Sequence, residues 1–104
     1  MITRKDDRLL VSGNVTIATV SALLGEALKL QAESGTGAKV LIDFAGLEKV
    51  DSSAVSLMLV WVREAQRSKM DLHFANVPAN LMSLAKLYGV AELLPVGAAN
   101  SLLL

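Results

Sequence analysis

Three residues have the types that a hydrolytic triad requires. Asp51, Ser52 and His73 offer a carboxylate, a hydroxyl and an imidazole, the groups that orient a base, attack a carbonyl and take up a proton. Nothing in the sequence places them in that geometry, and no Gly-x-Ser-x-Gly turn is present to expose a nucleophile. His73 lies in a segment whose side chains alternate between two faces, which favours a structural or surface imidazole over a catalytic one. We therefore predict that the chain is not an enzyme.

Metal and phosphate sites are also disfavoured. With one histidine and no cysteine, a metal site would consist almost wholly of carboxylates, and the ten acidic residues show no ligand-like spacing. The segment Ser34-Gly35-Thr36-Gly37-Ala38-Lys39 superficially resembles a phosphate-binding loop. It follows a predicted helix and precedes a predicted strand, however, which is the reverse of the order that directs a helix N-terminus at phosphate. We expect a helix-to-strand connection there, and neither a metal nor a cofactor.

The most informative segment is the turn Val50-Asp51-Ser52-Ser53-Ala54-Val55. Asp and Ser are preferred helix N-caps, because their side-chain oxygens accept hydrogen bonds from the unpaired amides of the first turn. A capping role alone therefore accounts for these residues about as well as a binding role does. The helix that follows, predicted from about Ser53 to Ser68, favours the binding role.

That helix has a wider apolar surface than packing on one sheet requires. At about 100° per residue, its broad apolar side carries Val55, Met58, Leu59, Trp61, Val62 and Ala65, and its polar side carries Ser56, Arg63, Glu64 and Arg67. Leu57 falls at the edge of the apolar arc and Val60 falls inside the polar face, so the arc approaches about 200°. Ser53, Leu57, Val60 and Glu64 are thus predicted to share a docking surface that begins at the serine turn. The alternative is that another part of the chain, such as its apolar tail, covers this surface.

Strands alternate with helices along the chain, which predicts one α/β domain. The expected strands are Leu9–Val11, Lys39–Phe44 and Asp71–Val77, of which the almost wholly apolar Lys39–Phe44 is central. A turn with unusual backbone angles is expected at Ser12-Gly13-Asn14, and Gly46 is expected to punctuate the strand that precedes it. The expected helices are Ile17–Ala32, Ser53–Ser68 and Ala79–Tyr88, the last preceded by Pro78 and ended by Gly89. The strands containing Val40 and Phe74 are predicted to be parallel through a right-handed crossover.

Length and composition restrict the partners. A chain of 104 residues is predicted to form a single domain over residues 1–104. Hydrophobic residues make up 53% and charged residues 19%, so apolar side chains are in surplus and must be buried in a partner or exposed as a patch.

Ten basic and ten acidic residues are dispersed, which argues against binding to nucleic acid. The sequence lacks a signal-peptide apolar region and any apolar run of the roughly 18 residues that span a membrane, so we expect a cytoplasmic domain without direct membrane insertion.

These residues resemble the STAS family, the domain of anti-sigma factor antagonists and of several transporter subunits. The apolar strand Val40–Phe44, followed by the turn Val50–Val55 and a helix, is similar to the hallmark of that family, and the resemblance covers nearly the whole chain. It implies a small STAS-like α/β sandwich with a mixed sheet of about four strands and about three to four helices. Within the family, the segments Gly46–Asp51, Leu84–Val90 and Leu94-Pro95 are most similar to the cytoplasmic STAS subunit of Mla-type phospholipid ABC transporters.

The transporter resemblance implies a non-catalytic subunit that binds the ATPase subunit and regulates or stabilises it. The implied process is phospholipid transport between the membranes of Gram-negative bacteria, which maintains outer-membrane lipid asymmetry. The implied location is cytoplasmic and peripheral at the inner membrane, through the transporter. Ser52 falls where that subunit uses a threonine in the ATPase contact, and Asp51 falls on the family aspartate. Together with the helix face, the expected partner-binding residues are Asp51, Ser52, Ser53, Ser56, Leu57, Val60 and Glu64.

The other branch of the family leaves an alternative open, an anti-sigma factor antagonist switched by phosphorylation. Ser53 falls where those antagonists carry the serine that their partner kinase phosphorylates. Phosphate there would add about 1.5 to 2 negative charges to the docking surface and release the partner. Ala54 replaces the glycine usual in the family, and its β-carbon restricts and crowds the turn, which weighs against a kinase more than against docking. A homo-oligomer, with Leu102-Leu103-Leu104 paired to a second copy, is also left open.

Overall fold

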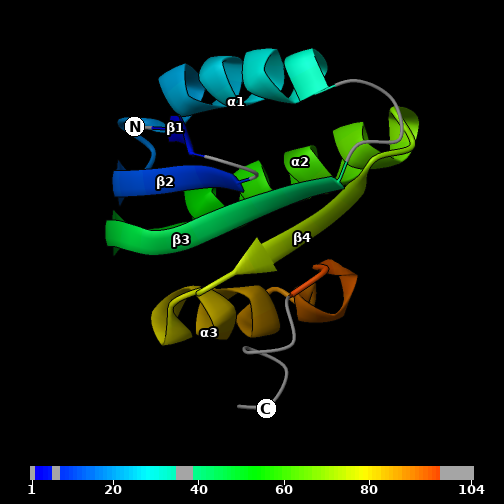
Figure 1. Ribbon diagram of the computed structural model, residues 1–104. Coiled ribbons are helices and arrows are strands. Elements are labelled where there is room, and N and C mark those ends of the chain that lie inside the picture. Colours follow the sequence, from blue (N-terminus) through cyan, green and yellow to red (C-terminus); the bar gives the residue numbers. More distant parts are fainter. Residues whose placement is uncertain (1, 6–7, 35–38, 97–104) are drawn as a thin grey trace.

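Four strands pair into one mixed sheet in the computed structural model, which describes residues 2–5, 8–34 and 39–96 (Figure 1). They are β1 (Ile2–Lys5), β2 (Arg8–Val15), β3 (Lys39–Val50) and β4 (Asp71–Ala75), and they lie side by side in that order. β1 runs antiparallel to β2, whereas β2, β3 and β4 are parallel to one another. The predicted parallel pairing is confirmed, with Val40 opposite Leu72 and Ile42 opposite Phe74.

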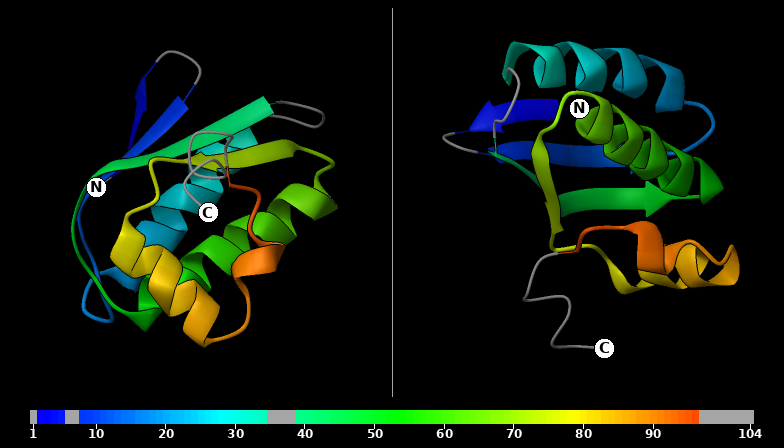
Figure 2. Two further views of the ribbon diagram at one scale, coloured as in Figure 1. Left: turned by 90° about the horizontal axis from the view of Figure 1, so that it is seen from below. Right: turned by 90° about the vertical axis from the view of Figure 1, so that its right-hand side faces the viewer.

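Helices cover one face of this sheet. They are α1 (Val20–Ser34), α2 (Ser52–Arg67) and α3 (Ala79–Leu87), followed by a short 3₁₀ helix, η1 (Ala91–Leu93). Figure 2 shows α1 and α2 on the same side of the strands, with α3 and η1 on the β4 side of the molecule. α2 contacts both α1 and α3. The structure therefore confirms the predicted fold class, an α/β sandwich with a mixed four-stranded sheet.

Side chains alternate along the strands as expected for a sheet with one covered face. In β4, Leu72 and Phe74 are buried, whereas Asp71 and His73 between them are exposed. In β2, Leu9 and Val11 are buried on the same covered face. The buried apolar side chains of these strands hold α1 and α2 against the sheet.

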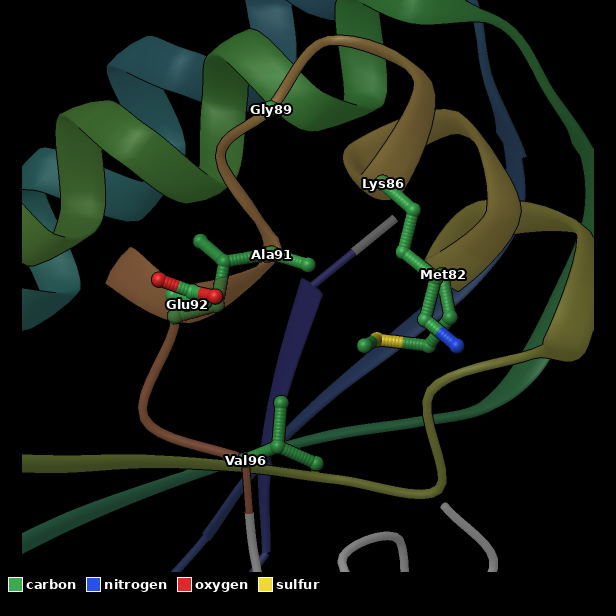
Figure 3. A pocket seen from close by; sticks show the side chains of 7 residues that line it. Met82, Lys86, Gly89, Ala91, Glu92 and Val96 are labelled. Atoms are coloured by element: carbon green, nitrogen blue, oxygen red, sulfur yellow. The ribbon is translucent and has the colours of Figure 1, made fainter.

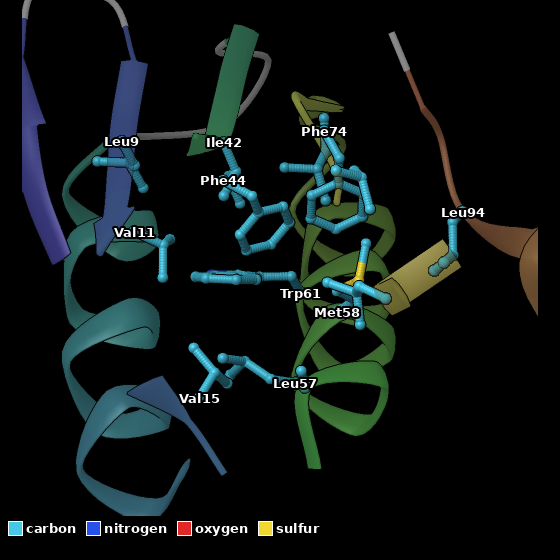
Figure 4. Packing of buried hydrophobic residues seen from close by; sticks show 14 of the residues in the cluster. Leu9, Val11, Val15, Ile42, Phe44, Leu57, Met58, Trp61, Phe74 and Leu94 are labelled. Carbon is cyan, nitrogen blue, oxygen red and sulfur yellow. The ribbon is translucent and has the colours of Figure 1, made fainter. Parts of the chain in front are cut away.

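The core centres on three aromatic rings between the sheet and α2. Phe44 of β3, Trp61 of α2 and Phe74 of β4 are each 2% exposed or less, and their ring centroids lie 5.5 to 6.2 Å apart (Figure 4). Tilted and offset ring pairs at such distances are favourable beyond the apolar area that they bury. The rings fix the position of α2 over β3 and β4, and with it the turn at which α2 begins.

One carboxylate is buried on the opposite face of the sheet. The side chain of Asp43, 5% exposed, accepts hydrogen bonds from the Arg8 guanidinium at 3.1 Å, the Asn76 amide at 2.9 Å and the Ala45 N–H at 2.9 Å. Burial by itself raises the pKa of Asp43, but these hydrogen bonds and the charge of Arg8 outweigh it and hold the pKa below its ordinary value. Asp43 thus ties β2 and β3 to the turn that follows β4.

A predicted turn and a predicted strand end are instead parts of long strands. Ser12-Gly13-Asn14 lies inside β2, so the predicted turn is wrong, although Gly13 has the expected unusual backbone angle, with φ at +82°. Gly46 lies inside β3 and does not end that strand. The strands stay paired because two register shifts, between Leu10 and Ser12 and between Gly13 and Val15, absorb the irregular backbone. At Gly46, an added β-carbon would lie 3.0 Å from Ser12 Cβ, so the glycine permits the close approach of the two strands. The longer strands carry the chain directly to Asp51.

The remaining differences lie toward the two ends of the described chain. β1 was not among the predicted strands, because its sequence Ile-Thr-Arg-Lys has little apolar alternation. The predicted cap at Gly89 is confirmed: its φ is +72°, and the N–H groups of Gly89 and Val90 donate to the carbonyls of Lys86 and Ala85. Residues 35–38 of the Ser34–Lys39 connection, and residues 97–104 of the apolar tail, lie outside the described residues.

Candidate functional site

The turn that precedes α2 is held by the side chain of Asp51. Its Oδ1 accepts a hydrogen bond from the Ser53 N–H at 2.8 Å, which caps the helix, and its Oδ2 accepts one from the Ile17 N–H at 3.0 Å. The backbone N–H of Asp51 donates to the Val15 carbonyl at 3.2 Å. One residue therefore fastens the start of α2 to the connection between β2 and α1.

The same two amides keep Asp51 ionised. The N–H of Ile17, and then that of Ser53, stabilise the carboxylate and lower the pKa of Asp51 below its ordinary value. Both carboxylate oxygens accept hydrogen bonds from the chain's own backbone. In this arrangement Asp51 positions the turn.

The connection between β2 and α1 is held by hydrogen bonds of its own. The Thr19 hydroxyl donates to the Asn14 carbonyl at 2.9 Å and accepts from the Thr16 N–H at 3.0 Å, while Asn14 Oδ1 accepts from the Lys49 N–H at 3.2 Å. Ile17 lies in this connection with 78% of its surface exposed. A large apolar side chain in water thus stands on a fixed backbone beside the capped serine turn.

We use the name docking turn for the surface formed by Ile17, Asp51, Ser52 and Ser56. Ser52 and Ser56 are both exposed, and their spacing places them one above the other on α2. Asp51 is partly exposed and joins the two connections. The docking turn combines one apolar side chain, two hydroxyls and one carboxylate, which suits contact with a protein surface better than bond-making chemistry.

The structure divides the predicted partner-binding residues into two groups. Besides the three that belong to the docking turn, Val60 and Glu64 are partly exposed, and Glu64 accepts a hydrogen bond from the Arg67 guanidinium at 3.0 Å. Ser53 and Leu57, by contrast, are buried, with 8% and 2% of their surfaces exposed. The expectation that Ser53 and Leu57 lie on an exposed docking surface is therefore wrong.

The physical reason is that α2 is covered by more than the sheet. α1 and α3 both contact it, and Figure 4 shows Leu57 pointing toward Val15 of β2 inside the core. A helix flanked in this way buries a wider arc than a helix lying alone on a sheet. Much of the wide apolar arc that the sequence displays is thus covered by the chain's own described elements.

His73 lies far from the docking turn. It pairs with Leu41 near the start of β3, whereas Asp51 follows Val50 at the other end of that strand. Its Nε2 lies 3.0 Å from Oδ1 of Asp71, and both side chains are more than half exposed. The residue types of a triad are therefore not brought together.

Two further observations concern other kinds of site. Within residues 2–5, 8–34 and 39–96, no three His, Cys, Asp or Glu side chains gather closely enough to hold a metal ion. None of the helices in this part of the chain is both long and apolar enough to cross a bilayer.

A hollow of about 400 Å³ lies between α3 and η1 (Figure 3). In Figure 3, Met82 and Lys86 from α3 face Ala91 and Glu92 from η1 across it. Gly89, Leu94 and Val96 complete the lining. These residues offer one ammonium and one carboxylate among apolar groups, without a hydroxyl, thiol or imidazole for nucleophilic chemistry.

The sequence did not single out two exposed side chains near the start of α2. Ile17 was expected at the beginning of a helix, but α1 begins at Val20 and leaves Ile17 in the preceding connection. Tyr88 is 54% exposed and lines a groove together with Ser52 and Ser56. The only sequence feature that marks Tyr88 is its place just before Gly89, where a helix ends.

Comparison with known proteins yields a family and a fold. A family model described as "Mlab, STAS domain" matches residues 1–95. Among curated protein sequences, none matches this chain.

Several solved structures are similar to it. The anti-sigma factor antagonist SpoIIAA in its unphosphorylated form is 13% identical, with a TM-score of 0.68 over 99% of this chain and 91% of that chain. A Thermotoga maritima protein described as a candidate anti-sigma factor antagonist is 8% identical, with a TM-score of 0.72 over 98% of this chain and 90% of that chain. A chain of the stressosome, a signal integration and transduction hub, is 19% identical, with a TM-score of 0.61 over 92% of this chain and 85% of that chain. At these identities the likeness shows the fold alone.

Proposed function

The chain belongs to the STAS family, in its MlaB-type branch, and from this premise we propose that it is the STAS subunit of an Mla-type phospholipid-transport ABC transporter. In this role it is not an enzyme. It binds the ATPase subunit from the cytoplasmic side, is peripheral at the inner membrane through that contact, and supports transport that maintains outer-membrane lipid asymmetry.

The observation that carries the proposal is the docking turn. Asp51 holds the start of α2 and the Ile17 connection together through amides on both sides, so the exposed groups stand on a backbone that is already ordered. An ordered surface loses little conformational entropy on binding, which favours affinity. Ser52 and Ser56 supply hydroxyls that donate and accept, and Ile17 supplies apolar area.

Binding at this surface gives the subunit a means of regulating its partner. If the docking turn binds one conformation of the ATPase more tightly than another, the population shifts toward the bound conformation by that difference in affinity. Equal affinity for all conformations would stabilise the ATPase against unfolding without changing its cycle. Val60 and Glu64, farther along the same helix, extend the proposed contact as partly exposed positions.

The alternative function, an anti-sigma factor antagonist, fits the fold equally well, and the position of Ser53 weighs against it. A kinase must reach the hydroxyl that it phosphorylates, yet Ser53 is only 8% exposed and its N–H is bound to Asp51 at 2.8 Å. Phosphorylation there would require the turn to open. Docking through Ser52 needs no such opening, because Ser52 is exposed already.

Co-expression with the Mla-type ATPase of the same organism tests the proposal. A tag on this chain should retain the ATPase through purification, and Ser52→Arg should weaken the complex about 10-fold or more by placing a bulky charge in the contact. Gln66→Arg is the matched control, because Gln66 is exposed at the far end of the same helix. Failure of the unaltered chain to bind the ATPase, together with phosphate transfer to Ser53 by a sigma-binding kinase, would establish the alternative instead.

A further inference from the structure

A groove of about 290 Å³ runs beside the docking turn, between the first half of α2 and the end of α3. It is lined by Ser52, Val55, Ser56, Leu59, Tyr88 and Val90. Its apolar wall comes from Val55, Leu59 and Val90, while Ser52 and Ser56 contribute hydroxyls. The groove and the docking turn therefore share two residues and form one continuous surface.

Size and charge restrict what this groove accepts. Its volume of about 290 Å³ is enough to hold one large side chain. All of its lining residues are uncharged, and a buried charge without a partner would be costly. The groove thus selects an uncharged, mainly apolar group.

The rim of the groove carries apolar surface that a partner would cover. Tyr88 lines the groove and is 54% exposed, and its neighbour in the chain, Leu87, is 75% exposed. Tyrosine is also among the residues that most often dominate binding energy in protein interfaces, because its ring is large and its hydroxyl stays hydrogen-bonded. Tyr88 is held at this rim by the end of α3, where its N–H donates to the Leu84 carbonyl at 3.1 Å.

We propose that this groove receives one uncharged apolar side chain of the ATPase subunit, packed against Tyr88 and Leu59, and that Tyr88 is a principal anchor of the contact. The inference rests on the proposed function and assigns it a specific point of attachment. The hydroxyls of Ser52 and Ser56 bind the polar backbone on either side of the inserted group. The groove adds apolar burial to a docking turn that is otherwise mostly polar.

The first test fills the groove with a large side chain of this chain itself. Ser56→Trp places an indole where the partner's side chain would lie, and it should lower the affinity for the purified ATPase by about 30-fold or more. Tyr88→Ala should lower it by about 10-fold or more, because it removes the anchor. Gln66→Trp, the same large residue at an exposed position almost three turns away, should leave affinity within about twofold. Thermal unfolding of all three variants checks that the fold is retained.

The outcomes separate this inference from the proposed function. If Ser56→Trp binds the ATPase normally while Ser52→Arg binds it more weakly, the inference that the groove receives a side chain of the ATPase is overturned. The proposed function then still stands. Absence of ATPase binding by the unaltered chain overturns both. If the chain forms a concentration-dependent dimer that Ser56→Trp abolishes, the groove binds a second copy of this chain. If removing residues 97–104 raises the affinity for the ATPase, the groove binds this chain's own tail. Either result also overturns the inference.

A second measurement does not depend on tolerance of the tryptophan. The chain has no cysteine, so Leu87→Cys, next to Tyr88 in the chain and outside the groove lining, introduces a unique thiol for a maleimide-linked photocrosslinker. Irradiation of the complex should join the label to the ATPase at or beside one uncharged apolar residue, identified by mass spectrometry. Crosslinks to charged or scattered positions, or only within this chain, overturn the inference.

Discussion

The two faces of α2 begin at neighbouring serines with opposite environments. Ser52 is exposed and forms part of the docking turn, whereas Ser53 is 8% exposed and lies against the core. The same contrast continues one turn along the helix, where Ser56 is exposed and Leu57 is buried. Adjacent residues of a helix point about 100° apart, so in a helix flanked by α1 and α3 one face packs in the core while the other stays exposed.

The largest expected effect is on the buried face. Leu57→Ala should lower the free energy of unfolding by about 3 kcal/mol, because it removes a fully buried side chain and leaves a cavity. Urea unfolding measures the loss. Val60→Ala is the control on the exposed face and should cost less than about 1 kcal/mol. Similar losses for the two variants would erase the distinction between the faces.

The serine pair gives a finer comparison. Ser53→Asp should destabilise the domain by about 1 to 3 kcal/mol, because a charge enters a buried position next to the Asp51 carboxylate. Ser52→Asp should change stability by no more than about 0.5 kcal/mol, since the position is exposed and a helix N-terminus tolerates negative charge. Thermal and urea unfolding of the two proteins check both values. A stable Ser53→Asp protein would show that phosphate fits at Ser53 without opening the turn.

Acid should weaken the fold through its two hydrogen-bonded aspartates. The pKa values of Asp43 and Asp51 are lowered in the folded chain, so the stability that they contribute is present above their ordinary pKa of 3.8. It is lost as the pH falls through their lower folded pKa values, because protonation then removes the favoured carboxylates. Unfolding curves between pH 7 and pH 2 should show this loss of stability. Asp43→Asn should make the loss smaller than Asp51→Asn does, because Asp43 is the buried carboxylate. An unchanged acid profile in Asp43→Asn would contradict the role assigned to that carboxylate.

Val60→Glu should have a small effect on stability and a larger one on binding, because it changes a partly exposed position. Its free energy of unfolding should fall by about 0.5 to 1 kcal/mol, while affinity for the ATPase falls about 10-fold because a charge enters the proposed contact. Isothermal titration with the purified ATPase, beside urea unfolding, separates the two effects. Unfolding of this variant would place Val60 in the core and narrow the docking surface to the docking turn and its groove.

Much of the fold follows from local patterns. The apolar run Lys39–Phe44 marks the central strand β3, and the alternation in Asp71–Ala75 marks the edge strand β4. Asp51 and Gly89 mark where helices begin and end. These features depend on neighbours in sequence, so they can be derived without the structure. β1 pairs with β2, the next strand in the chain, but has little apolar alternation to mark it. The continuation of β2 and β3 through their glycines depends on pairing between two strands that α1 separates in the chain, which no local pattern contains.

Only part of the docking site, like only part of the fold, could be predicted from the sequence. That a capped serine turn begins α2 can be read from the residues alone, since Asp and Ser at that place satisfy the first amides of the helix. Which serine reaches the surface depends on tertiary packing: α2 lies against the sheet and contacts α1 and α3, with Ser53 and Leu57 buried and Ser52 and Ser56 exposed. The tertiary structure also brought Ile17 and Tyr88, far apart in the chain, beside that turn through the Asp51 hydrogen bond and the packing of α3 on α2. Helical periodicity assigns residues to faces, but what covers each face depends on elements that are distant in sequence.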